Sequence, residues 1–303
     1  MKQINLAAQN YKISISFRDD DIEDYDFEQI REEVDLELAN FEFATNKKNP
    51  DSEITKFNKE INEFKGSKDF FDYLADAIFW YGATDGIFNP FANSINSDFK
   101  NIKGKEWNGD DLFKLNNIRH DFPRKLDELT EYIDIDYENY IVKFKRQVEL
   151  DLSGINKGIF IDRLTKRLKK YSEEFHIQFG GDNFYANDDP EDDWNFTINN
   201  PVTMESGDIN LKISNEALSI SGNTGQNHVI DDVSSYQLLN PQTQKKTNGN
   251  LALVIIKGQD CKTTDVLAKA FLIADEDERE ELSNKFRKIQ RMEVDSSGRV
   301  TMY

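Results

Sequence analysis

The stretch Asp151-Leu-Ser-Gly-Ile-Asn-Lys-Gly158 combines residue types that suit the binding of a phosphate group. It stands where an expected strand turns into an expected helix. Gly154 would let backbone approach a ligand closely. The free N–H groups of a helix start and the Lys157 ammonium both favour an anion such as a diphosphate. A strand–glycine–helix junction is common and usually structural, so this stretch alone indicates a ligand only weakly.

Four later segments carry glycines or polar residues at the ends of expected strands and helices. Gly180-Gly-Asp182 follows an apolar strand, where paired glycines make room for a bound group or serve a tight bend. Ser221-Gly222 ends another strand, and His228-Val-Ile-Asp231 places an imidazole near a carboxylate. Asp265 is expected to begin a helix, where the helix dipole favours a carboxylate.

In this order, the five segments resemble the motifs of the ApbE family. That family carries an Asp-Leu-Gly-Gly-Ile-Ala-Lys-Gly-like motif, then Gly-Gly-Asp, Ser-Gly, His-Ile-Ile-Asp-Pro-x-Thr-Gly and Ala-Asp-Ala-Leu-Ala-Thr. Asp51-Ser-Glu-Ile-Thr-Lys-Phe-Asn58 and Thr84-Asp-Gly-Ile-Phe-Asn-Pro90 agree with the family's Asp-Ser-Glu-Ile-Ser-x-x-Asn and Thr-x-Gly-x-Phe-Asp-Pro. The resemblance covers about residues 5–275, and seven weak motifs in one order are hard to obtain by chance.

The resemblance implies an enzyme that splits FAD, passes FMN to a Ser or Thr hydroxyl of a target flavoprotein and releases AMP. It implies a magnesium ion held by the backbone oxygen of Gly154, by Asp265 and by the residue four positions later, which fits the preference of magnesium for oxygen ligands. Catalytic roles are expected for His228, Asp265 and Lys157. Contacts with the flavin nucleotide are expected for Gly86, Ile87, Phe88, Asn89, Asp151, Gly154, Lys157, Gly180, Gly181, Asp182, Ser221, Gly222, His228 and Asp231.

This chain departs from the family pattern at several of these positions. Lys269 stands where the family has the Thr that ligates the metal, and a protonated ammonium cannot ligate magnesium. Asp265 and Lys269 are one helical turn apart, so a direct ion pair could replace or weaken the metal site. Asn89 replaces an Asp, and the histidine motif has lost its Pro, Thr and Gly to Asp232, Ser234 and Ser235.

These departures leave three functions open. The first is a working flavin transferase with a divergent site. The second is a module that binds a flavin nucleotide or a protein partner without transferring FMN, because resemblance in fold does not secure function when site residues change. The third is a FAD pyrophosphatase, in which water takes the place of the acceptor hydroxyl.

Charge and composition exclude several other classes of protein. The net charge of −19 and the pI of about 4.6 repel nucleic-acid phosphates and anionic lipid. The single cysteine, Cys261, cannot form an internal disulfide, and there is no Cys/His cluster for zinc. We find no run of ~18 apolar residues, no signal peptide and no lipid-acceptor cysteine near the start. We therefore expect a cytoplasmic protein without a membrane span or a nucleic-acid partner.

The elements that must position these motifs alternate without a regular βαβ period. Helices are expected over residues 26–44, 67–81, 155–171, 264–274 and 277–289, and strands over 11–17, 140–144, 148–150, 175–179, 183–186, 194–198, 209–213, 217–220 and 251–256. Leu251–Ile256 is apolar throughout, as in a strand buried on both faces, and residues 291–303 form an expected hairpin. We predict an α+β fold: one ApbE-like, T-fold-related domain over residues 1–303, with mixed sheets and flanking helices in two lobes around a flavin site.

Overall fold

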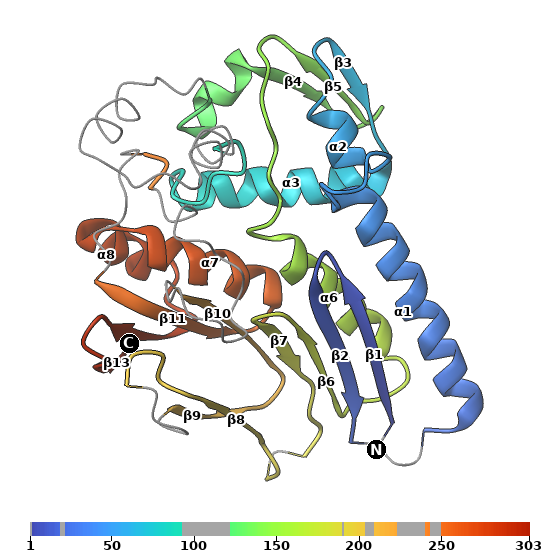
Figure 1. Cartoon of the computed structure of the whole chain (residues 1–303), viewed down its shortest axis with the longest axis vertical. Coiled ribbons are helices and arrows are strands. Elements are labelled where there is room, and N and C mark those ends of the chain that lie inside the picture. The colour runs from blue at the N-terminus through green and yellow to red at the C-terminus, as the bar shows by residue number, and fades with distance from the viewer. Residues whose placement is uncertain are drawn as a thin grey trace, which may run out of the picture.

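The computed structural model describes residues 2–18, 22–92, 122–189, 191–203, 209–222, 240–242 and 250–303. Within them, one large sheet has helices packed on one face, and a smaller sheet lies at the opposite end of the molecule (Figure 1). This arrangement confirms the predicted α+β class. The large sheet contains, in spatial order, β1 (Gln3–Ala8), β2 (Tyr11–Phe17), β6 (Phe175–Phe179), β7 (Asp182–Tyr185), β10 (Glu216–Gly222), β11 (Leu251–Gly258), β12 (Gln290–Asp295) and β13 (Val300–Met302).

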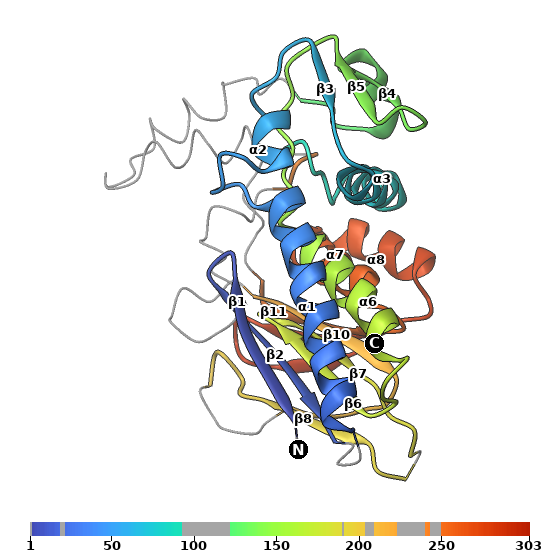
Figure 2. The ribbon, with the colours of Figure 1, turned by 90° about the vertical axis from the view of Figure 1, so that its right-hand side faces the viewer.

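Helices α1 (Asp24–Thr45), α6 (Asn156–Leu168), α7 (Cys261–Ile273) and α8 (Glu276–Lys285) lie on one side of this sheet (Figure 2). The sequence dictates this packing, because the apolar residues of α6 recur at helical spacing and those of β2 alternate. Ile161, Leu164 and Leu168 of α6 are fully buried in the same cluster as Ile15 and Phe17 of β2. The main core therefore lies between the helices and the sheet.

A second, smaller cluster lies on the other face of the sheet, under the pair β8 (Trp194–Ile198) and β9 (Ile209–Ile213). Strand β11 contributes to both clusters, with Val254 and Ile256 facing the helices and Leu253 and Ile255 facing β8 and β9. This confirms that the apolar run is a strand buried on both faces.

The smaller sheet has the order β3 (Glu63–Lys65), β5 (Ile141–Phe144) and β4 (Ile133–Asp136), and lies beside α2 (Glu53–Phe57), α3 (Lys68–Ala83) and the 3₁₀ helix η1 (Leu126–Glu131). Aromatic rings fill the space between these elements. Phe57 of α2 lies 5.4 Å from Phe64 and 5.1 Å from Phe144, measured between ring centroids. These rings are continuous with the main core, because Phe57 and Phe64 belong to the same cluster as the residues between the helices and the large sheet.

Several predictions about individual elements are wrong. Residues 148–150 do not form a strand, because the Asn58 side chain takes the place of a neighbouring strand: its amide oxygen accepts from Leu150 N at 2.8 Å and its nitrogen donates to Leu150 O at 3.0 Å. Strand β1 was not expected. The sheet pairings within the described residues are antiparallel rather than mixed.

The predicted limits of the helices also need correction. Helix α7 begins at Cys261, because Asp260 caps it by accepting from Thr263 N at 2.8 Å. Asp265 therefore lies inside the helix rather than at its start. Helices α6 and α8 end at Leu168 and Lys285, earlier than expected. The other expected helices and strands are present within a few residues of their predicted limits.

Candidate functional site

The starts of α6 and β7 and the interior of α7 bring two lysines and two aspartates together. We call Lys157, Asp182, Asp265 and Lys269 the buried charge cluster. Lys157 Nζ lies 2.8 Å from Asp182 Oδ2, and these side chains are only 4% and 3% exposed. Asp265, 2% exposed, accepts from Lys269 Nζ at 2.7 Å through Oδ1 and from Gly158 N at 3.2 Å through Oδ2. The ion pair expected between Asp265 and Lys269 is thus confirmed.

Backbone contact between α6 and α7 holds this cluster in place. A Cβ on Gly158 would lie 2.6 Å from the carbonyl oxygen of Cys261, so only glycine allows the two helices to approach so closely. Asp162, one turn further along α6, accepts from the backbone N–H groups of Cys261 at 2.7 Å and Lys262 at 2.9 Å. Burial and the nearby Asp260 carboxylate raise the pKa of Asp162 to about 7.

The pKa of Asp265 is determined by burial and by the charged side chains around it. Burial and the Asp182 carboxylate raise the pKa of Asp265 to about 6, and the ammonium groups of Lys269 and Lys157 oppose this shift. The N–H of Gly158, at the start of α6, is used by this carboxylate. The start of α6, which the sequence predicts to bind a phosphate, therefore binds the Asp265 carboxylate through Gly158 N.

The loop before α6 is fixed by contacts from distant parts of the chain. Asp151 pairs with Lys47, whose Nζ lies 2.6 Å from Oδ2, and accepts from Ser153 N at 2.9 Å. Burial acts to raise the pKa of Asp151, but Lys47 and Ser153 lower it to about 2. Sequence reasoning missed Lys47, because nothing in the local motif points to a partner so far away.

The same loop meets α7 and the turn around Gly86. Lys269 Nζ donates to the carbonyl oxygen of Ser153 at 3.0 Å, so the ammonium joins the loop to the helix. A Cβ on Gly154 would lie 2.6 Å from Phe88 Cε2 and 3.7 Å from Lys269 Cδ. The space beside Gly154 is thus occupied by side chains of this chain, which places Phe88 and Lys269 next to the predicted phosphate-binding stretch.

The turn that contains Gly86, Ile87, Phe88 and Asn89 is closed by its own hydrogen bonds. Gly86 adopts a positive φ of 84°, and Phe88 N donates to Thr84 Oγ1 at 3.1 Å. Asn89 donates to Pro123 O and accepts from Phe91 N, both at 2.9 Å. The Asn89 amide, which replaces the family's Asp, therefore stabilises the backbone of the turn and its contact with Pro123.

The structure places the other predicted residues as follows. Gly180 and Gly181 form the two-residue turn between β6 and β7, and Gly180 has a φ of 62°, so the tight-bend interpretation of this pair holds. Ser221 is buried and pairs with Val254 in the sheet, and Gly222 ends β10. His228 and Asp231 lie outside the described residues.

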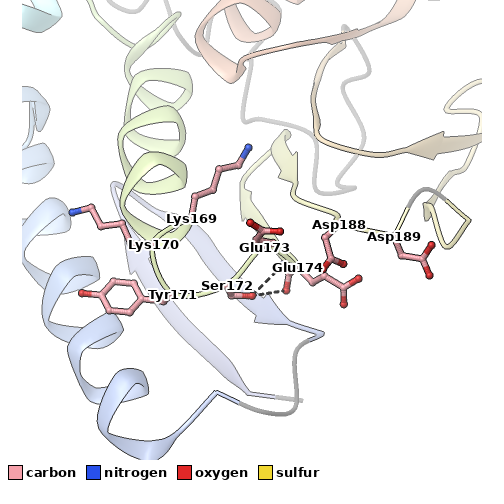
Figure 3. A pocket seen from close by; sticks show the side chains of 8 residues that line it. All are labelled: Lys169, Lys170, Tyr171, Ser172, Glu173, Glu174, Asp188 and Asp189. Atoms are coloured by element: carbon pink, nitrogen blue, oxygen red, sulfur yellow. Dashed lines mark hydrogen bonds between the residues drawn. The ribbon is translucent and has the colours of Figure 1, made fainter.

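A separate, open hollow of about 630 Å³ lies beyond the C-terminal end of α6. In Figure 3 its acidic side chains gather on one side, whereas Lys170 and Tyr171 lie on the other side, toward α1. Burial and the Asp188 carboxyl raise the pKa of Glu174. None of the predicted site residues lines this polar hollow, which is formed by Lys169, Lys170, Tyr171, Ser172, Glu173, Glu174, Asp188 and Asp189.

Comparison with known families agrees with the motifs. The model of the ApbE family matches residues 9–292. The chain belongs to the ApbE family. Among characterised relatives, the FAD:protein FMN transferases of Chlamydia trachomatis and Chlamydia muridarum are each 22% identical over 258 and 252 residues, which cover 80% of this chain and 75% of each relative.

Solved structures of ApbE proteins share the fold. The flavin transferase ApbE of Vibrio cholerae superposes with a TM-score of 0.77 at 18% identity, covering 100% of this chain and 96% of that protein. The ApbE protein of Thermotoga maritima gives the same TM-score and identity, covering 99% of this chain and 96% of its own. Within the described part of this ApbE chain, no helix is long and apolar enough to cross a membrane.

Proposed function

We propose that this chain is a FAD:protein FMN transferase, which splits FAD, attaches FMN to a hydroxyl of a target flavoprotein and releases AMP. The observation that carries the proposal is the ApbE match over residues 9–292, which includes all four residues of the buried charge cluster. The two chlamydial relatives that cover most of this chain carry the same activity in their names.

The reaction needs positive charge close to a diphosphate. The acceptor oxygen attacks the FMN phosphorus, and negative charge builds up on the phosphate that leaves as AMP. In our proposal the diphosphate lies beside the loop before α6, next to Lys269, whose side chain is 18% exposed against 4% for that of Lys157. In this arrangement the Lys157 ammonium pairs with Asp182 and fixes the position of that carboxylate. Asp265 accepts a hydrogen bond from Lys269 and orients its ammonium.

The finer details of the function are also proposals. The flavin nucleotide would contact the turn around Phe88, the segment from Asp151 to Lys157, and the regions of Asp182, Ser221 and His228. The acceptor would be a flavoprotein with a Ser or Thr flavinylation site, and enzyme and acceptor would meet in the cytoplasm. Magnesium is implied by the family resemblance alone, and the residue roles proposed here do not depend on it.

The direct test mixes the purified chain with FAD and an acceptor flavoprotein that carries a Ser/Thr flavinylation site. We expect mass spectrometry to find an FMN-sized addition on the acceptor and chromatography to find an equal amount of AMP. An acceptor in which the target hydroxyl residue is replaced by Ala serves as the matched control. The experiment is run with magnesium and with a chelator, so that metal dependence does not decide whether activity is seen.

Three other results would contradict the proposal. Release of AMP and free FMN without labelling of the acceptor would identify a pyrophosphatase. Binding of FAD in a calorimetric titration without either product would identify a binding module. Absence of FAD binding would overturn every flavin-based function for this chain.

A further inference from the structure

The Lys269 ammonium joins two parts of the site that belong to different elements. Its Nζ lies 2.7 Å from Asp265 Oδ1, on its own helix, and 3.0 Å from the carbonyl oxygen of Ser153, in the loop before α6. A carboxylate oxygen and a backbone carbonyl oxygen are the kinds of donor that magnesium prefers. The ammonium therefore lies between two oxygens that would suit a metal ion.

The residues at this place do not fit a divalent metal ion. A protonated lysine offers no lone pair to a metal and repels any cation beside it. The second oxygen of Asp265 already accepts from Gly158 N at 3.2 Å. In the described ranges, no three His, Cys, Asp or Glu side chains are gathered so that they could hold a metal ion.

The buried charge cluster is also electrically balanced as it stands. Lys157 compensates Asp182 at 2.8 Å, and Lys269 compensates Asp265 at 2.7 Å. A dication at the same place would add two positive charges to a region where three of the four side chains are at most 4% exposed. Uncompensated charge in such a place is strongly unfavourable, so the cluster has no need of a metal to become neutral.

Lys269 is the member of the cluster that a substrate can reach. Its side chain is 18% exposed, whereas those of Lys157, Asp182 and Asp265 are 4%, 3% and 2% exposed. Its stem passes Gly154, where an added Cβ would lie 3.7 Å from Lys269 Cδ. The ammonium is therefore next to the loop at which the proposed function places the diphosphate.

We propose that Lys269 is a tethered cation that takes the place of the divalent metal ion, so that this chain transfers FMN without magnesium. This inference rests on the proposed function. The acceptor hydroxyl oxygen forms a bond to the FMN phosphorus, and the bond from that phosphorus to the bridging oxygen breaks. AMP leaves with the electron pair on that oxygen, and the hydroxyl proton is released to solvent. The Lys269 ammonium stabilises the negative charge that builds up on the leaving phosphate.

The test follows FMN transfer by the full chain and three variants, with a chelator or with added magnesium. The wild type should keep its rate in the chelator, and magnesium should change it by less than about twofold, as a general salt effect would. Lys269→Thr should lose about 10²-fold in the chelator and recover with magnesium, because a hydroxyl can ligate the ion. Lys269→Met should lose as much without recovery, and Lys269→Arg should keep part of the metal-free rate.

A second readout does not depend on activity. The FAD-loaded protein is titrated with Mn²⁺, and binding is followed by electron paramagnetic resonance. The wild type and Asp265→Asn should bind the same amount of Mn²⁺, because the wild type has no Mn²⁺ site that depends on Asp265. Lys269→Thr should gain such a site, and Lys269→Thr combined with Asp265→Asn should lose it. Thermal unfolding of each variant checks that the protein is folded.

Two results would overturn the inference: a chelator that abolishes wild-type transfer until magnesium is restored, or an Asp265-dependent Mn²⁺ site in the wild type. If no condition yields AMP or labelled acceptor, the proposed function fails instead. The Mn²⁺ titration would then still decide whether Lys269 excludes a metal ion.

Discussion

The two ends of α6 carry the same kinds of side chain but differ in their access to water. Near the N-terminal end, Lys157 and Asp182 are at most 4% exposed and pair at 2.8 Å. At the C-terminal end, Lys169, Lys170 and Glu173 are exposed around the polar hollow. A buried charge must be paired to be tolerated, whereas an exposed charge is solvated and contributes little. Burial with a partner, rather than residue type, therefore distinguishes the N-terminal end of α6 from its C-terminal end.

The pKa values of Asp151, in the loop before α6, and Glu174, beyond its C-terminal end, shift in opposite directions. Burial acts to raise the pKa of Asp151, but the Lys47 ammonium lowers it to about 2. Burial and the Asp188 carboxyl raise the pKa of Glu174. Asp151, paired with Lys47, thus favours its ionised form, and Glu174, beside Asp188, favours its protonated form.

The largest effect is expected from Lys157→Met, which leaves Asp182 buried without its partner. Removing one member of a buried ion pair lowers the free energy of unfolding by about 3–5 kcal/mol. Urea denaturation followed by circular dichroism measures this change. The matched control at the other end of the helix is Lys170→Met, for which we expect a change within about 0.5 kcal/mol. Equal effects of the two substitutions would remove the contrast between the ends.

A smaller, pH-dependent effect is expected from Asp151→Asn. The pKa of Asp151 is lowered from 3.8 to about 2 in the folded chain, so its carboxylate stabilises the fold above about pH 4. At neutral pH the variant should lose about 1–2 kcal/mol of unfolding free energy, less than the full shift implies because Lys47 is partly exposed. The loss should shrink as the pH falls from about 4 toward 2. A loss that stays constant over this range would argue against the ion pair with Lys47.

The smallest effect is expected from Glu174→Gln, with the opposite sign. A carboxyl group whose pKa is raised stabilises the folded state below its unfolded pKa, and this contribution is lost as the pH rises through the folded value. At neutral pH the ionised Glu174 faces Asp188, so Gln should leave the free energy of unfolding unchanged or raise it by up to about 0.5 kcal/mol. FMN transfer should be unaffected. A clear loss of stability in chemical denaturation would show that Glu174 has a favourable partner.

The fold could be predicted where a segment carries its own pattern. Alternation in β2 and the apolar run of β11 identified strands whose faces are buried as expected. The strand predicted over residues 148–150 is absent because the backbone of Leu150 bonds to the side chain of Asn58, a contact that no local sequence pattern reveals. The predicted start of α7 is wrong because the helix begins earlier, at Cys261, where the Asp260 side chain caps it by accepting from Thr263 N.

The contacts of the candidate site are likewise predictable only where they are local in sequence. The pair of Asp265 and Lys269 could be predicted because helix geometry alone brings residues four apart together. The pairs of Lys157 with Asp182 and of Lys47 with Asp151 could not, since each depends on how distant segments pack. The roles of Lys157 and His228 in binding and catalysis stay predictions.

The hydrogen bonds of Asp162 to the backbone N–H groups of Cys261 and Lys262 tie the first turn of α7 to α6. Because Asp162 lies in the middle of α6, opening of the first turn of α7 must break both hydrogen bonds, which opposes fraying of that helix start. Bending at the start of α7 would therefore disrupt its contact with α6. An incoming nucleotide would instead meet a preorganised surface, and little ordering entropy would be lost when it binds.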